Sequence, residues 1–141
     1  LVKETVALAR SHRRAAWCRF EAEGPVTAPF RGQPALLRQA LLNLLLNAAD
    51  ATGNHGSVRV VTRDVAPGQL VIEVHDNGPG VPPEIAERVG QPLFTTKPDG
   101  TGLGLLSVRF CAEQHGGRLD FGRSETLGGA VFRLWLRRPT E

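Results

Sequence analysis

Two asparagines and an aspartate are spaced so that one helix would bring their side chains together. The stretch "LLNLLLNAADAT", residues 41–52, is otherwise almost wholly apolar up to Asp50. Asn43 and Asn47 are one helical turn apart, and Asp50 falls on the same face. Because an uncompensated amide in an apolar interior costs about 1–3 kcal/mol, each must find partners. Nearby loop backbone is one partner. The other is Mg²⁺, which takes oxygen ligands and also accepts phosphate oxygens.

A glycine-rich stretch at the start of a predicted helix could bind phosphate groups. The segment "DGTGLGLLSV" places Gly100, Gly102 and Gly104 where a helix begins. Free backbone N–H groups and the positive end of the helix dipole attract anions there. The Rossmann fingerprint would require a preceding strand and a glycine in place of Leu105, and the Walker pattern would require GK[ST]. Both of these nucleotide loops are therefore excluded.

A second glycine-rich stretch, "HDNGPGV", follows a predicted strand and puts Asp76 at the strand end, with Gly78 and Gly80 after it. A carboxylate accepts hydrogen bonds and repels anions, so we expect it to bind a donor such as an exocyclic amine. The glycines would let a flat ring approach the backbone. Taken alone, the stretch is better explained as a plain turn capped by the aspartate.

The surrounding sequence predicts the elements that position these groups. Alternation along residues 69–76 puts Asp76 on the same strand face as Leu70, Ile72 and Val74, toward the core. We expect an α+β fold in two layers, with a mixed, mostly antiparallel sheet covered on one face by three helices. The three predicted helices are 34–51, 82–89 and 103–114, and residues 1–13 are predicted as the tail of a further helix that comes from upstream. The predicted strands are 14–23, 25–30, 57–65, 69–76 and 128–138, and a loop covers 90–100.

Size and composition exclude several classes of protein. A chain of 141 residues, 41% hydrophobic and 22% charged, is typical of one globular domain. Cys18 and Cys111 lack CxxC spacing, which predicts two reduced core thiols. The net charge of +3 comes from scattered arginines, so nucleic acid binding is not favoured. The sequence begins at Leu1 and contains no methionine, and we expect it to be a piece of a longer protein.

Four motifs in register identify a resemblance. "NLLLNAADA", "DNGPG", "FTTK" and "GTGLGL" occur in the order, and at about the separations, of the N, G1, F and G2 boxes. The sequence resembles the catalytic and ATP-binding domain (HATPase_c) of bacterial two-component sensor histidine kinases. This family belongs to the GHKL superfamily, with gyrase, Hsp90 and MutL, whose fold is the Bergerat ATP-binding sandwich. The resemblance covers roughly residues 15–137. It implies an ATP-binding domain over 14–141 and an upstream helical stem whose tail is 1–13.

The resemblance also implies roles for individual residues. Asn47 would bind Mg²⁺ with Asn43 beside it, as the catalytic pair, and Asp76 would receive the adenine amino group of ATP. Other residues would shape the base pocket and wrap the phosphates under a mobile lid. The further nucleotide contacts are Asp50, Gly78, Gly80, Val81, Phe94, Thr96, Lys97, Gly100, Thr101, Gly102, Leu103, Gly104 and Leu105.

Some positions depart from the family pattern. Asp50 stands where many such kinases have Lys or His, and we expect it to bind water near the metal. Gly90 and Leu93 replace two aromatics that are common in the F box. Ala130 in the last strand replaces a threonine beside the adenine site, which removes one water-mediated contact.

The reaction that the resemblance implies is transfer of the γ-phosphoryl group of ATP to a histidine on a separate dimerisation domain. A response regulator receiver domain would then take the phosphoryl group. His12 is followed by Arg13 and has Trp17 at the fifth position, so it does not match the acceptor pattern, and the acceptor is expected upstream. We expect a cytoplasmic domain, monomeric in isolation and without direct membrane contact, either free or in the cytoplasmic part of a membrane-bound sensor.

Two alternatives remain open. One is a free-standing GHKL-type ATPase, in which Asn43 would correspond to a glutamate that activates water. An amide cannot take up that proton, so Asn43 favours the kinase. The other is a non-catalytic interaction module gated by nucleotide, which would bind ATP without any phosphotransfer.

Overall fold

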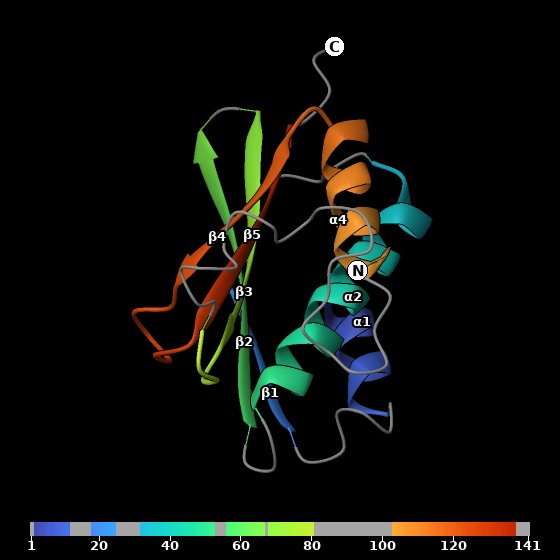
Figure 1. Cartoon of the computed structure of the whole chain (residues 1–141). Coiled ribbons are helices and arrows are strands. Elements are labelled where there is room, and N and C mark those ends of the chain that lie inside the picture. The colour runs from blue at the N-terminus through green and yellow to red at the C-terminus, as the bar shows by residue number, and fades with distance from the viewer. Residues whose placement is uncertain are drawn as a thin grey trace.

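The computed structural model describes residues 2–11, 18–24, 32–52, 56–66, 68–80 and 103–137. Within these ranges, three helices lie on one face of a five-stranded sheet (Figure 1), which confirms the predicted α+β class and its two layers. The helices are Val2–Arg10 (α1), Pro34–Thr52 (α2) and Leu103–Gln114 (α4), and the strands are Cys18–Glu23 (β1), Gly56–Ala66 (β2), Gln69–Asp76 (β3), Arg118–Arg123 (β4) and Ala130–Arg137 (β5). The predicted strand 25–30, helix 82–89 and loop 90–100 lie outside the described residues.

The sheet has the order β1-β2-β3-β5-β4. β1 pairs with β2 in parallel and every other pairing is antiparallel, as the prediction of a mixed, mostly antiparallel sheet required. Strand β4 was not predicted from the sequence. Its six residues contain only two large apolar side chains, Leu119 and Phe121, and this run is too short for alternation to stand out. Pairing with β5 makes it a strand.

The core lies between α2 and the sheet. An apolar stripe at helical spacing runs along α2 and is buried along its length (Leu37, Leu41, Leu44, Leu45 and Ala48). It packs against apolar side chains of β2, β3 and β5, including Val60, Val74 and Leu134. Asn43 and Asn47 are only half-buried and Asp50 is exposed, so the expectation that the asparagines lie in an apolar interior is wrong. They flank the stripe because the apolar side chains alone fill the layer beneath α2.

Helix α1 packs on the same core. Its buried side chains are Thr5, Val6 and Ala9, and Arg10 Nη2 donates a hydrogen bond of 2.8 Å to the carbonyl of Phe20 in β1. None of the helices in the described part of the chain is long and apolar enough to cross a membrane.

Both cysteines are free thiols, as predicted. Cys111 is buried in α4, whereas Cys18 at the start of β1 is only half-buried. Burial raises the pKa of the Cys111 thiol to about 11, so it stays protonated and unreactive at neutral pH.

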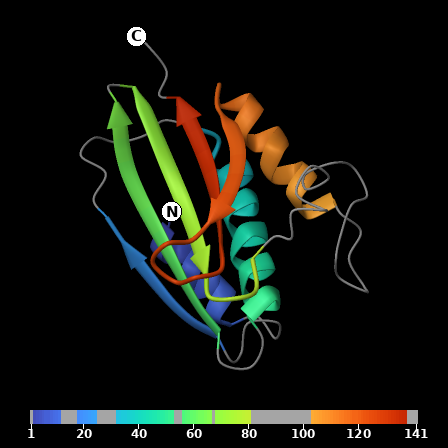
Figure 2. The same cartoon turned by 60° about the vertical axis from the view of Figure 1, so that its left-hand side comes forward.

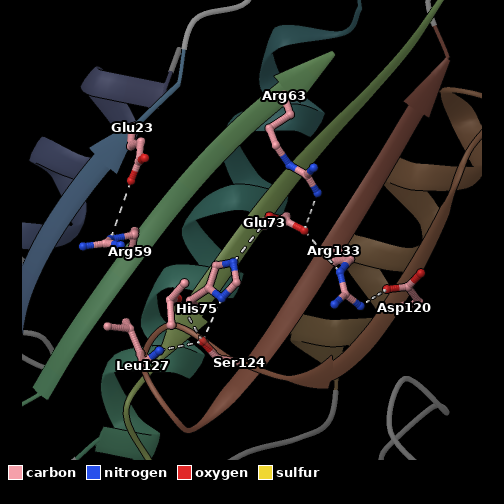
Figure 3. A network of polar contacts seen from close by, with 10 residues as sticks. Glu23, Arg59, Arg63, Glu73, His75, Asp120, Ser124, Leu127 and Arg133 are labelled. Atoms are coloured by element: carbon pink, nitrogen blue, oxygen red, sulfur yellow. Dashed lines mark hydrogen bonds and ion pairs between the residues drawn. The ribbon is translucent and has the colours of Figure 1, made fainter. Parts of the chain in front are cut away.

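The face of the sheet opposite the helices carries a charged network (Figure 3) centred on Glu73 of β3. Glu73 Oε2 accepts hydrogen bonds from Arg63 at 2.9 Å and from Arg133 at 3.2 Å. Arg133 also contacts Asp120 at 3.2 Å. Burial acts to raise the pKa of Glu73, but the hydrogen bonds and charges of Arg63 and His75 outweigh it and lower this pKa below its usual value.

Replacing Glu73 with glutamine is expected to lower the free energy of unfolding by about 1–2 kcal/mol at neutral pH, because it removes charge-assisted bonds to two arginines. Since the folded-state pKa is depressed, the contribution of Glu73 is complete above its ordinary pKa of 4.5. It disappears as the pH falls through the lower folded-state value. Urea unfolding of both proteins at neutral and acidic pH measures this, and a difference that grows on acidification would contradict the network.

Candidate functional site

Asp76 ends β3 with a buried carboxylate that two backbone groups hold. Its exposed fraction is 2%, as the prediction that it points toward the core required. Oδ1 accepts the N–H of Gly78 at 2.9 Å and that of Ala130 at 3.1 Å. Both of these bonds end on Oδ1, and among the described residues none reaches Oδ2. Burial raises the pKa of Asp76, although the hydrogen bonds from Ala130 and Gly78 and the nearby His75 act against this shift.

Two glycines let three segments meet at this carboxylate. A Cβ on Gly129 would overlap the carboxylate and carbonyl of Asp76 and the amide of Gly78. A Cβ on Gly78 would lie 2.6 Å from the carbonyl oxygen of Ala51 near the end of α2. The end of α2, the loop after β3 and the start of β5 therefore touch through backbone. Gly80 has a φ of +82°, in the region that favours glycine.

Sequence reasoning assigned no role to Gly129. Its signal was the Gly128-Gly129 pair at the start of the last predicted strand. The pair reads as a turn, and only the packing on Asp76 shows why a side chain is excluded at the second glycine.

The asparagine face of α2 lies near Asp76. The C-terminal ends of α2 and β3 lie at the same end of the molecule (Figure 1). Asn47 is about one helical turn before Ala51, which contacts Gly78. Asn43 Oδ1 accepts a hydrogen bond of 3.2 Å from Gln39, a side chain on the same helix. The predicted metal-binding and amine-binding groups are thus on adjacent elements.

A divalent cation at this face would depend on amide oxygens. Among the described residues, no group of three or more His, Cys, Asp or Glu side chains could hold a metal ion. The chemistry of the donors fits Mg²⁺, which binds through one or two protein oxygens, waters and substrate phosphates and needs no complete protein cage.

Helix α4 begins at Leu103, as predicted, within the glycine-rich stretch. Its first turn contains Gly104 and Leu105 and has backbone N–H groups without intrahelical partners. α4 lies antiparallel beside α2 on the same face of the sheet (Figure 2). The N-terminus of α4 therefore points toward the C-terminal end of α2, the end nearer to Asn47. The other predicted contacts lie outside the described residues: Val81, Phe94, Thr96, Lys97, Gly100, Thr101 and Gly102.

His115 has a structural role. Its Nδ1 lies 2.7 Å from the carbonyl oxygen of Cys111, and its Nε2 lies 3.0 Å from the backbone N of Gln33. These partners require a proton on Nδ1 and an acceptor at Nε2, which is the neutral ring. His115 thus joins the end of α4 to the start of α2. His12 and His55 lie outside the described residues.

Comparison with known proteins agrees with this geometry. The profile of the family described as "Histidine kinase-, DNA gyrase B-, and HSP90-like ATPase" (HATPase_c) matches residues 32–140. The chain belongs to this ATPase family. Sensor histidine kinase ZraS of Salmonella typhimurium is 43% identical over 106 residues, which cover 75% of this chain and 23% of ZraS. Nitrogen regulation protein NtrY of Azorhizobium caulinodans is 37% identical over an alignment of 145 positions that covers 97% of this chain and 18% of NtrY.

Solved structures of this family have the same fold. The catalytic domain of histidine kinase ThkA superposes with a TM-score of 0.84 at 29% identity, over 97% of this chain and 90% of that one. A structure of ThkA in complex with the response regulator protein TrrA matches with a TM-score of 0.79 at 25% identity, over 98% of this chain and 39% of that one. The HATPase_c chain spans less than a quarter of the length of ZraS and of NtrY.

Proposed function

We propose that this HATPase_c domain is the catalytic and ATP-binding part of a sensor histidine kinase. It would transfer the γ-phosphoryl group of ATP to a histidine on a separate dimerisation domain, from which a response regulator takes it. The observation that carries the proposal is the buried Asp76 carboxylate, whose Oδ1 is held by backbone N–H groups. This carboxylate lies near the C-terminal end of α2, the helix that bears Asn47. The relatives named sensor histidine kinase support it.

The Asp76 carboxylate can select adenine. A buried carboxylate without a cation must find hydrogen-bond donors, and the amino group of adenine is a neutral donor of suitable size. Since Gly78 and Ala130 bind Oδ1, the amino group would be received by Oδ2. Guanine and hypoxanthine carry an oxygen at the corresponding position, and this acceptor would face the carboxylate. We therefore infer a strong preference for adenine.

The other end of the nucleotide would lie toward α2 and α4. The amide oxygen of Asn47 would bind Mg²⁺, which neutralises phosphate charge when bound. The N–H groups of the first turn of α4 would donate to phosphate oxygens. Asn43, also an amide, cannot remove a proton from water, so the site lacks a general base at this position and keeps the γ-phosphoryl group for another acceptor.

We further propose that residues 1–13 are the tail of an upstream helical stem docked on the ATP-binding domain over 14–141. The burial of Val6 and Ala9 against α2 and β1 supports a docked arrangement. The partners would be the histidine-bearing dimerisation domain and a receiver domain, in keeping with the ThkA complex. The isolated domain would be a cytoplasmic monomer without membrane contact.

A reconstitution experiment tests the proposed function. The 141-residue chain is incubated with Mg²⁺ and γ-labelled ATP, with and without a separately purified dimerisation stem from its full-length protein. We expect ATP binding and slow hydrolysis by the chain alone, because phosphoryl transfer needs a positioned nucleophile. Acid-labile label should appear on the stem only when both are present. Label on His12 of the isolated chain, brisk ATP turnover, or ATP binding without label on the stem would contradict the proposal.

The affinity for ATP is expected to fall on acidification through the titration of Asp76. The pKa of this carboxylate is raised above its ordinary 3.8, and the adenine amino group binds its ionised form. Protonation therefore opposes binding, in a pH range above the one in which an ordinary aspartate titrates. Calorimetry between about pH 7 and about pH 5 measures this effect. ATP phosphates also titrate in this range, and Asp76→Asn measures their contribution because it lacks the carboxylate. If the ATP affinity of both proteins depends equally on pH, Asp76 does not bind the adenine amino group.

A further inference from the structure

A buried histidine and serine lie directly behind Asp76, on the sheet face opposite the helices. His75 precedes Asp76 on β3, and its Nδ1 is 2.8 Å from Ser124 Oγ (Figure 3). The exposed fractions are 9% for His75 and 1% for Ser124. The Nε2 atom of His75 is 3.4 Å from Oε1 of Glu73.

Hydrogen bonds on both ring nitrogens hold His75 between Glu73 and Ser124. The Glu73 carboxylate can only accept, so Nε2 of His75 carries a proton and donates it. Nδ1 contacts the hydroxyl of Ser124, which can donate to a neutral ring and accept from a protonated one. Ser124 Oγ in turn accepts the backbone N–H of Leu127 at 3.1 Å. The three side chains thus form a chain of satisfied bonds that ends on a backbone turn.

This cluster is not arranged for nucleophilic catalysis. A Ser–His–Glu series would require a hydroxyl that a substrate can reach. Ser124 is almost fully buried and its oxygen is occupied by the Leu127 N–H. The role of the cluster therefore lies in the conformation of the turn.

The turn from Ser124 to Gly129 connects the cluster with the carboxylate of Asp76. The Ser124 N–H donates to the Gly129 carbonyl at 2.7 Å, and the Gly128 N–H donates to the Ser124 carbonyl at 2.9 Å. The Gly129 N–H donates to the Asp76 carbonyl at 3.0 Å. The next N–H, that of Ala130, holds Asp76 Oδ1. One end of the turn is therefore fixed by His75 and the other by Asp76.

We propose that Ser124 and His75 are positioning residues for nucleotide binding, which hold this turn so that the Ala130 N–H fixes Oδ1 of Asp76 and directs Oδ2 to the adenine amino group. The inference rests on the proposed function. The terminal torsion of an aspartate is broad, so its carboxylate can rotate unless hydrogen bonds define it. Neither positioning residue touches the nucleotide.

The test compares ATP with inosine triphosphate, which has an oxygen in place of the amino group. For Ser124→Ala, we expect the Kd of ATP to rise about 5- to 20-fold, because the loosened turn no longer orients Asp76. The Kd of inosine triphosphate should change by less than about twofold, because this nucleotide gains nothing from Oδ2. A merely structural defect would weaken both nucleotides alike and would overturn the proposal.

Two histidine variants separate the contacts of the ring. In His75→Asn the amide takes the place of Nδ1 and can still bind Ser124, whereas in His75→Gln it extends to the place of Nε2 near Glu73. We expect the asparagine variant to keep the preference for ATP and the glutamine variant to lose it. Glu125→Ala, at an exposed position of the same turn, is the matched control and should bind both nucleotides as the unmodified chain does.

The amide resonance of Ala130 gives a readout independent of nucleotide. Its proton shift reports the bond to Asp76 and should move in Ser124→Ala and His75→Gln while remaining in place in His75→Asn. If the unmodified chain does not bind ATP, both the proposed function and this inference are overturned. If ATP binds in a manner that depends on Asp76 but the variants leave the nucleotide preference and this resonance unchanged, only the positioning inference is overturned. If Ser124→Ala does not fold, the comparison of His75→Asn with His75→Gln tests the positioning inference.

Discussion

Replacing Asp76 with asparagine is expected to weaken ATP binding by about 1.5–3 kcal/mol, because a charged acceptor at a buried position becomes a neutral amide. In the variant, the amide oxygen can keep the bonds from Gly78 and Ala130 that end on Oδ1. The amide nitrogen then takes the place of Oδ2 and presents a donor to the adenine amino group, itself a donor. The preserved bonds should keep the fold, so the loss is specific to the nucleotide.

Calorimetry of the folded variant measures this loss, and an unchanged ATP affinity would rule out the adenine assignment. Asp64→Asn makes the same chemical change on β2 and is the matched control, with an expected change in ATP affinity of less than about twofold. Unfolding measurements give a second check. Because burial raises the pKa of Asp76 in the folded protein, this charge opposes folding at neutral pH. Acidification should therefore stabilise the unmodified protein relative to Asp76→Asn.

Replacing Asn47 with alanine is expected to reduce labelling of the separately supplied stem by about 100-fold or more, because the variant lacks the amide oxygen proposed to bind Mg²⁺. Asn47 is half-buried beside the apolar stripe of α2, so alanine should be accommodated without loss of the helix. Asn47→Ala should weaken nucleotide binding much less when Mg²⁺ is absent. Labelling at increasing Mg²⁺ concentration measures the effect.

Gln114→Ala, an exposed amide near the end of α4, is the matched control and should label the stem at the normal rate. Labelling by Asn47→Ala at the rate of the unmodified chain would rule out the metal assignment. Brisk ATP turnover that survives Asn47→Ala would also contradict it, and would favour an ATPase whose general base is not Asn43.

Several features of the site were predictable because they depend on local sequence. The apolar stripe of α2 has helical period, and the spacing of Asn43 and Asn47 then places their side chains one turn apart. Alternation along β3 predicted that Asp76 points to the core, and its exposed fraction of 2% confirms this. The start of α4 at Leu103 follows from the glycines before it.

Other features depend on contacts between residues far apart in the chain. The hydrogen bond from Ala130 to Asp76 joins positions separated by 54 residues, and no local pattern contains it. The sequence predicted an aspartate at a strand end. Only the pairing of β5 with β3 decides that Oδ1 of Asp76 accepts the N–H of Ala130. The edge strand β4 likewise exists because β5 offers it a partner.

The amino-acid sequence by itself determined the helix that carries the asparagines, the strand that ends in Asp76 and the four motifs of the family, since period and residue type act over a few neighbouring positions. The tertiary structure alone decided that Gly129 must lack a side chain, because Asp76 and Gly78 occupy that space. It also decided that His75 and Ser124 form a buried pair, since 49 residues of chain separate them. A hydrogen bond between distant residues exists only when the folded backbone brings both groups within about 3 Å in the right direction.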